Sequence, residues 1–128
     1  MENTKKILVV EDDQFMREFY QELLTEEGYE VEIAADGFEG EQKFLAGGYD
    51  LVLLDIMLPK KDGLEILRDA KNKPPKVKNG PIVILTNLGQ DAIIKEGFTL
   101  GASGYIIKSA MAPDEILNEI NMFLNKKV

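Results

Sequence analysis

Asp55 is an acid at the end of an apolar run, a position where a carboxylate needs a partner. It follows residues 51–54, four large apolar side chains that are typical of a strand covered on both faces. An ionised carboxylate at the end of such a strand costs free energy unless it is paired with a cation or bound to a metal. Asp55 is therefore a candidate for ion pairing or metal binding.

Two further acids, Glu11 and Asp12, follow another apolar run at residues 7–10. If the two runs are neighbouring parallel strands, all these acids meet at one sheet edge and repel one another unless a cation lies between them. Oxygen ligands completed by water suit Mg²⁺ better than zinc. The sequence thus predicts a magnesium site, although Glu11 and Asp12 taken alone are equally consistent with solvated loop acids.

Asp13, Thr86 and Lys108 also stand at the ends of predicted strands or beginnings of helices. Asp13 precedes an amphipathic stretch, so helix capping competes with metal binding as its role. A hydroxyl at a strand end, such as that of Thr86, usually satisfies a nearby backbone group. Lys108 is either an exposed strand end or the cation that faces the acids. The combination of these residue types at one edge indicates a site.

Five short apolar runs alternate with segments of helical spacing, and together they predict the scaffold. The runs are residues 7–10, 31–35, 51–54, 82–85 and 105–107, and helices are expected over 15–24, 38–45, 64–71, 91–100 and from 113 onward. This alternation predicts an α/β fold, a doubly wound five-stranded parallel sheet. In the flavodoxin-like strand order 2-1-3-4-5, the two strands that end in acids flank the point where strand order reverses.

Local signals mark the ends of several predicted helices. Gly28 closes the first helix, Asp62 is placed to cap the third, and Pro113 suits the first turn of the fifth. Residues 71–81, rich in lysine and proline, predict a surface loop rather than a domain boundary.

Composition excludes several classes of protein. The chain has 15 Lys plus Arg against 23 Asp plus Glu, a net charge of −8 that opposes direct binding to nucleic acid or anionic lipid. It has no histidine and no cysteine, so imidazole bases and thiolate metal sites are excluded. Its 128 residues predict a single domain, 1–128. Without a signal-peptide pattern or a membrane-spanning apolar run, we expect a soluble cytoplasmic protein.

Four segments in order resemble the receiver domain of two-component response regulators: KILVVEDD, LLDIMLPKKDG, IVILTN and LGASGYIIK. The resemblance covers essentially the whole chain and implies a CheY-like fold. It implies that Asp55 accepts a phosphoryl group from a partner's phosphohistidine, with Mg²⁺ as the cofactor. Such a domain is a phosphoacceptor and not an enzyme, apart from slow self-dephosphorylation. In this family the donor histidine belongs to a separate protein, in keeping with a chain that has none.

The same resemblance assigns roles to the metal ligands. Asp12 and Asp55 would bind Mg²⁺ directly, and Glu11 would bind it through water. The backbone carbonyl of Met57 would add a further oxygen.

The resemblance also implies a switch. Lys108 would pair with the phosphoryl group, Thr86 would hydrogen-bond to it, and the ring of Tyr105 would turn inward when Thr86 moves. The surface formed by the fourth helix, fifth strand and fifth helix would then change, with Ile94, Tyr105 and Ile107 as candidates for its apolar part. The implied partners are a sensor histidine kinase or histidine phosphotransfer protein, and a downstream target or output domain. Phosphorylation-dependent homodimers are common in the family.

Two residues depart from the family pattern. Ser109 stands where proline, joined by a cis bond, usually follows the lysine. A cis bond to serine costs about 2.5–4 kcal/mol, so either the loop is strained or the bond is trans and Lys108 is held differently. Asn87 stands where a small residue usually follows the threonine, and we expect it to change the dephosphorylation rate.

Three other functions compete with this reading. A magnesium-dependent phosphohydrolase would use an aspartyl intermediate, but the segment EDDQF lacks the D-x-D pattern of those known to us. A flavin or nucleotide carrier would need a glycine-rich phosphate cradle, whereas the first loop here is acidic. A degenerate receiver would act only as a docking module.

Overall fold

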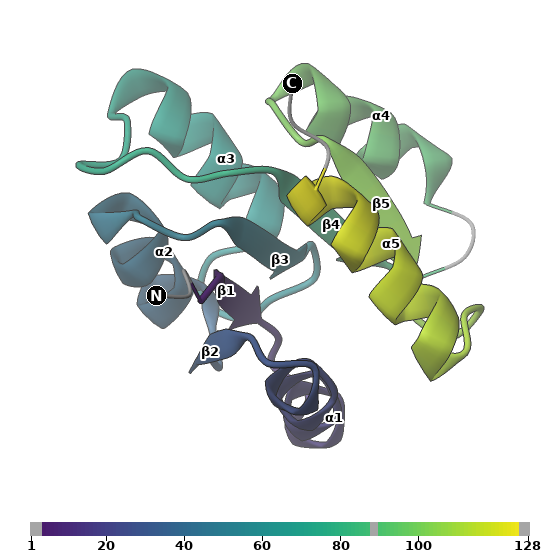
Figure 1. Cartoon of the computed structure of the whole chain (residues 1–128). Helices are drawn as coiled ribbons and strands as arrows, with labels where there is room; N and C mark the ends of the chain where they lie inside the picture. The colour runs from purple at the N-terminus through teal and green to yellow at the C-terminus, as the bar shows by residue number, and fades with distance from the viewer. Residues whose placement is uncertain (1–3, 88–89, 126–128) are drawn as a thin grey trace.

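The computed structural model describes residues 4–87 and 90–125, and its centre is a five-stranded parallel sheet (Figure 1). The strands are β1 (Lys6–Val10), β2 (Glu30–Ala34), β3 (Leu51–Asp55), β4 (Ile82–Thr86) and β5 (Gly104–Ile107). The helices are α1 (Gln14–Glu26), α2 (Gly37–Ala46), α3 (Gly63–Asn72), α4 (Asp91–Thr99) and α5 (Pro113–Asn125). The strand order is β2-β1-β3-β4-β5. The predicted fold class and strand order are therefore confirmed.

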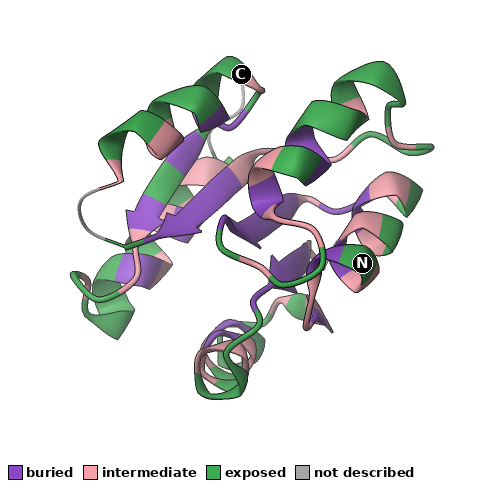
Figure 2. Cartoon of the chain, turned by 180° about the vertical axis from the view of Figure 1, so that it is seen from behind, coloured by how far each residue is buried: buried purple, intermediate pink, exposed green. Residues whose placement is uncertain are grey.

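Helices cover both faces of the sheet. On one face, α1 and α5 pack through buried side chains such as Tyr20 and Ile120. On the other, α2 and α3 contribute Phe44 and Ile66, and α4 packs beside α3 through the half-buried Ile93. Figure 2 shows the strands buried between helices whose outer surfaces are exposed. Burial on both faces explains why the strand sequences are continuously apolar.

Strand register brings the predicted site residues together at one edge of the sheet. Val10 of β1 pairs with Leu54 of β3, so the residues that follow them, Glu11 and Asp55, leave the sheet side by side. Thr86 is the last residue of β4 and pairs with Ile107 of β5, directly before Lys108. The carboxyl ends of parallel strands form the crevice where such folds bind ligands.

Aspartate caps begin the helices that leave this edge. The side chain of Asp13 accepts a hydrogen bond from the Met16 N–H at 3.2 Å, which confirms its predicted capping role in α1. Asp62 caps α3 in a reciprocal capping box with Glu65, also as predicted. These caps fix where the acidic loop after β1 and the loop after β3 end.

The second strand ends one residue earlier than the sequence predicts. Ala35 lies outside β2 because its N–H donates to Glu39 Oε1 at 2.9 Å and so contributes to the start of α2. The predicted surface loop also starts later than residue 71, since α3 continues to Asn72. The remaining loop is largely exposed.

The loop after β3 is fastened to α2. The N–H of Gly37 donates to the Pro59 carbonyl at 3.1 Å. A Cβ at Gly37 would lie 1.7 Å from the Lys61 carbonyl oxygen, so only glycine permits this approach. The Lys61 ammonium pairs with Glu41 at 2.6 Å and with Asp69, which ties the loop to α2 and α3.

We expect Gly37→Ala to lower the free energy of unfolding by about 2–3 kcal/mol, because the added methyl group meets backbone that cannot move aside easily. Helix propensity alone predicts the opposite sign, a gain of roughly 0.5–1 kcal/mol. Urea unfolding of both proteins measures the difference. Gln42→Ala in the same helix is the control and should stay within about 0.5 kcal/mol of wild type. A Gly37→Ala protein as stable as wild type would show that the loop does not depend on this contact.

Candidate phosphoacceptor and metal site

Lys108 stands between two buried carboxylates at the carboxyl edge of the sheet. Its Nζ lies 2.9 Å from Glu11 Oε1 and 2.9 Å from Asp55 Oδ2. Glu11 and Asp55 are both almost completely inaccessible to solvent. The structure therefore confirms that the lysine after β5 faces the acids after β1 and at the end of β3, and is not simply an exposed strand end.

Asp55 is fixed through both of its oxygens. Oδ1 accepts a hydrogen bond from the Met57 N–H at 3.0 Å, and Oδ2 accepts one from Lys108 Nζ at 2.9 Å. These two donors fix the orientation of the carboxylate. The role of the Met57 carbonyl as a metal ligand stays a prediction.

Glu11, Asp12 and Asp55 together could hold a metal ion. Each offers one carboxylate oxygen, and the three oxygens lie within 4.8 Å of one another. Asp12 is exposed whereas the other two acids are buried, so the cluster opens to solvent on one side. Three carboxylates against the single charge of Lys108 leave a negative site of oxygen donors, which fits Mg²⁺. Asp13, which caps α1, is not part of this cluster.

Burial controls the protonation of Glu11. Loss of solvation raises its pKa from 4.5 to about 7; the pairing with Lys108 and a hydrogen bond from the Asp13 N–H oppose this rise, while the charge of Asp55 adds to it. Burial also disfavours the Lys108 ammonium, but its hydrogen bonds to Glu11 and Asp55 outweigh that effect and raise its pKa. Lys108 therefore stays charged, while Glu11 titrates near neutral pH.

Two further residues shape the site and were not anticipated from the sequence. Arg17 Nη1 donates to the carbonyl oxygens of Glu11 and Asp12, at 3.0 and 3.1 Å, and so holds the acidic loop. Gln90 accepts a hydrogen bond from the Thr86 hydroxyl through its Oε1 at 2.5 Å. In the sequence, a basic residue about one helical turn after the acids is a weak signal for the Arg17 contacts. No sequence signal marks the contact of Gln90 with Thr86.

Tyr105 lies away from this crevice. The residue is 44% exposed, and its ring packs edge to face on Phe98 of α4, with ring centroids 6.3 Å apart. Ile94 and Ile107 are half-buried. An inward turn of the Tyr105 ring stays a prediction.

The serine after Lys108 does not displace the lysine. The described residues contain no cis peptide bond, so Lys108 and Ser109 are joined in the trans form. The Lys108 N–H donates to the Thr86 carbonyl at 2.8 Å, which continues the pairing of β4 with β5 and directs the side chain to the acids. The trans alternative is the one observed. Asn87 is exposed beside Thr86, and its effect on dephosphorylation stays a prediction.

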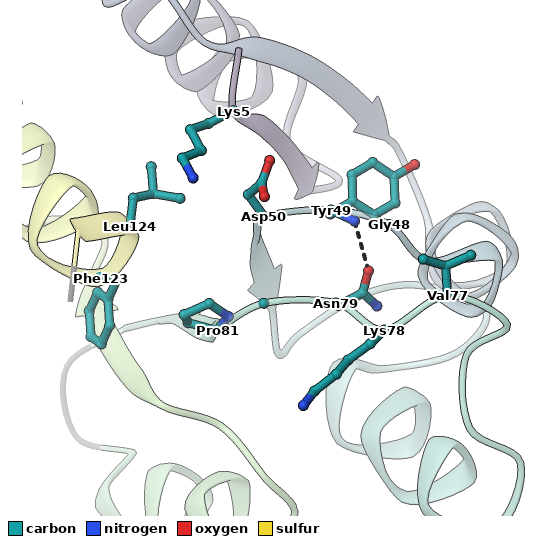
Figure 3. A pocket seen from close by; sticks show the side chains of 11 residues that line it. Lys5, Gly48, Tyr49, Asp50, Val77, Lys78, Asn79, Pro81, Phe123 and Leu124 are labelled. Atoms are coloured by element: carbon teal, nitrogen blue, oxygen red, sulfur yellow. Dashed lines mark hydrogen bonds between the residues drawn. The ribbon is translucent and has the colours of Figure 1, made fainter. Parts of the chain in front are cut away.

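A second hollow lies at the opposite edge of the sheet, among the segments that lead into β1, β3 and β4 (Figure 3). Its volume is about 440 Å³. Two of its polar groups are engaged with the protein: Asn79 Oδ1 accepts from the Tyr49 N–H at 3.1 Å (Figure 3), and Asp50 Oδ2 accepts from the Lys6 N–H at 2.8 Å. The carboxylates of the Glu11, Asp12 and Asp55 cluster lie at the other edge, outside this hollow.

A family model for the response regulator receiver domain matches residues 7–121. The chain therefore belongs to the receiver domains of two-component response regulators.

Similar proteins include transcriptional regulators and a chemotaxis protein. The transcriptional regulatory protein DltR of Streptococcus agalactiae is 43% identical over 117 residues, which cover 91% of this chain and 50% of DltR. The chemotaxis protein CheY of Treponema pallidum is 39% identical over 106 residues, 80% of this chain and 72% of CheY. The chain spans about half the length of the transcriptional regulators that it matches.

Solved receiver domains share the fold. The CheY-like receiver domain protein of Methanospirillum hungatei superposes with a TM-score of 0.84 and 31% identity, covering 97% of this chain and 96% of that one. TrrA of Thermotoga maritima, solved in complex with Mg²⁺ and beryllium fluoride, gives a TM-score of 0.77 and 35% identity, covering 94% and 99% of the two chains. Over the part of the chain that the structure describes, no helix has the length and apolar character needed to cross a bilayer.

We expect ionisation of Glu11 to destabilise the metal-free protein between about pH 5 and pH 8. Because its pKa is about 7 in the folded protein and 4.5 ordinarily, the folded state holds the proton more tightly. Its contribution to stability is complete below pH 4.5 and is lost as the pH rises through 7, a change on the order of 3 kcal/mol. Urea unfolding in the presence of a chelator measures the free energy of unfolding of both proteins. As the pH rises across this range, the free energy of unfolding of Glu11→Gln should increase by this amount relative to that of wild type. A constant difference between the two proteins would contradict the expectation.

Proposed function

We propose that Asp55 accepts a phosphoryl group from the phosphohistidine of a sensor histidine kinase or histidine phosphotransfer protein. The observation that carries the proposal is the buried Asp55 carboxylate, held by Lys108 and the Met57 N–H, with Glu11 and Asp12 beside it. The shared family supports the same chemistry.

The transfer needs little from the protein besides placement and charge. A carboxylate oxygen of Asp55 forms a bond to phosphorus, the P–N bond of the donor breaks, and its electron pair returns to the imidazole ring. The product is an acyl phosphate. No general base is required because a carboxylate oxygen is itself the nucleophile. Lys108 is placed to stabilise the charge on the phosphoryl oxygens.

The acid cluster is placed to bind Mg²⁺, which when bound neutralises charge on the phosphoryl group and helps to align it. Asp12 and Asp55 would hold the ion directly, Glu11 through water, and Met57 through its carbonyl. The complex of TrrA with Mg²⁺ and beryllium fluoride supports this assignment by analogy.

Phosphorylation would switch the protein through Thr86. The new acceptor oxygens would attract the Thr86 hydroxyl, and the ring of Tyr105 would then turn inward and alter the surface of α4, β5 and α5. An output domain or a separate protein would read that surface, and phosphorylated copies would pair through it. The many transcriptional regulators among similar proteins support an output of this kind. We place these events in the cytoplasm.

We propose a phosphoacceptor rather than a turnover enzyme. A phosphohydrolase would release phosphate continuously, whereas this domain would hold one phosphoryl group and lose it slowly. A docking module would take up none. The complete set of acids, lysine and threonine at the site favours the phosphoacceptor.

Incubation with Mg²⁺ and a small phosphodonor, followed by intact-mass measurement, tests this function. We expect wild-type protein to gain one phosphoryl group that hydroxylamine removes, and Asp55→Asn to gain none, because the nucleophile is lost while size is kept. Asp114→Asn, on the exposed start of α5, is the matched control and should be phosphorylated like wild type. Continuous phosphate release, or a phosphoryl group on Asp55→Asn, would contradict the proposal.

A further inference from the structure

Gln90 binds the hydroxyl on which the proposed switch depends. Thr86 is only 1% exposed, and its Oγ1 donates to Gln90 Oε1 at 2.5 Å. A longer contact of 3.3 Å joins the same hydroxyl to the Asn87 carbonyl, and the Asn87 N–H lies 3.4 Å from Gln90 Oε1. The Gln90 carboxamide oxygen thus gathers both donors at the end of β4.

This hydrogen bond competes with the contact that phosphorylation requires. A threonine hydroxyl has one hydrogen to donate. While that hydrogen is given to Gln90, it cannot be given to a phosphoryl oxygen on Asp55. Asp55 is meanwhile held by Lys108 and the Met57 N–H, and among the described residues it makes no hydrogen bond to Thr86.

Gln90 also begins α4. Its carbonyl accepts the Ile94 N–H at 3.0 Å, but its side chain makes no capping bond to the helix and is turned to Thr86 instead. Near the other end of α4, Gly97 lies against Ile84 of β4, where an added Cβ would come within 2.1 Å of a side-chain carbon. The first turn of α4 is therefore linked through Gln90 to the residue that must move.

We propose that the Gln90 side chain is a latch that holds Thr86 in the resting arrangement and transmits its release to α4. Gln90 is a positioning residue and does not contact the reacting atoms. The proposal rests on the proposed function of Asp55 and adds to it a residue that sets the balance between the resting and active states. A ligand that draws Thr86 to Asp55 must first break the Gln90 bond, so losing that bond favours the active state.

A double-mutant cycle tests the latch. Gln90→Leu keeps the size of the side chain and removes the acceptor, and Thr86→Val removes the donor. We expect Gln90→Leu to raise the affinity for beryllium fluoride in the presence of Mg²⁺ by about 3–10-fold, the range expected for loss of one competing hydrogen bond. In the Thr86→Val background the same change should have little effect, because no hydroxyl remains to be released. Titration calorimetry measures all four proteins.

Two controls separate a latch from a general loosening of the loop. Gln42→Leu should leave the affinity unchanged, because Gln42 lies in α2, which contacts β1 and β2, whereas Thr86 lies in β4. In the absence of beryllium fluoride, three-bond couplings of Thr86 should show a changed χ1 population in Gln90→Leu, which a merely structural role would not produce.

The outcomes distinguish this proposal from the function on which it rests. Unchanged affinity and unchanged Thr86 couplings in Gln90→Leu would overturn the latch while a wild-type protein that is phosphorylated on Asp55 retains its function. An equal rise in affinity with and without the Thr86 hydroxyl would also overturn it, because the effect would not pass through that group. A wild-type protein that accepts no phosphoryl group would overturn both.

Discussion

The ion pairs of the Lys108 ammonium with two buried carboxylates are the interactions on which the site depends. Glu11 and Asp55 leave neighbouring strands at the same level, and their charges would oppose folding if no cation stood between them. Lys108 alone cannot balance three acids, which leaves a place for a divalent cation and for the charge of an incoming phosphoryl group. The same arrangement of charges therefore opposes folding and provides a place for a divalent cation and a phosphoryl group.

The rest of the fold supplies the rigidity that such a site needs. Arg17 holds the loop that carries Glu11 and Asp12, and Lys61 helps to fasten the loop after Asp55 to the neighbouring helices. By contrast, the Thr86 hydroxyl is held by the carboxamide of Gln90 at the start of α4 and by a longer contact to the Asn87 carbonyl. A firmly held group of acids beside a lightly held hydroxyl is the arrangement expected of a switch, in which charge is fixed and a small group moves.

Much of this could be predicted from the sequence because the signals are local. Continuous apolar runs predict the strands, and the polar residue after each run marks the carboxyl end of that strand. The fold and the proximity of Asp55, Asp12 and Lys108 therefore follow from the sequence pattern and the strand order. The contacts of Gln90 with Thr86 and of Gly37 with Pro59 were not predictable in this way. They depend on rotamers and on loops brought together by tertiary packing, which leave no periodic trace in the sequence. The isomer of the Lys108–Ser109 bond likewise depends on tertiary packing and cannot be read from the sequence.

An experimental structure with Mg²⁺ and beryllium fluoride is the most direct measurement of the central claim. The account predicts beryllium fluoride on an Asp55 oxygen, Lys108 Nζ and Thr86 Oγ1 within hydrogen-bond distance of its fluorines, and Mg²⁺ in contact with Asp12. Density for the metal away from these acids, or a Lys108 side chain directed away from Asp55, would contradict it.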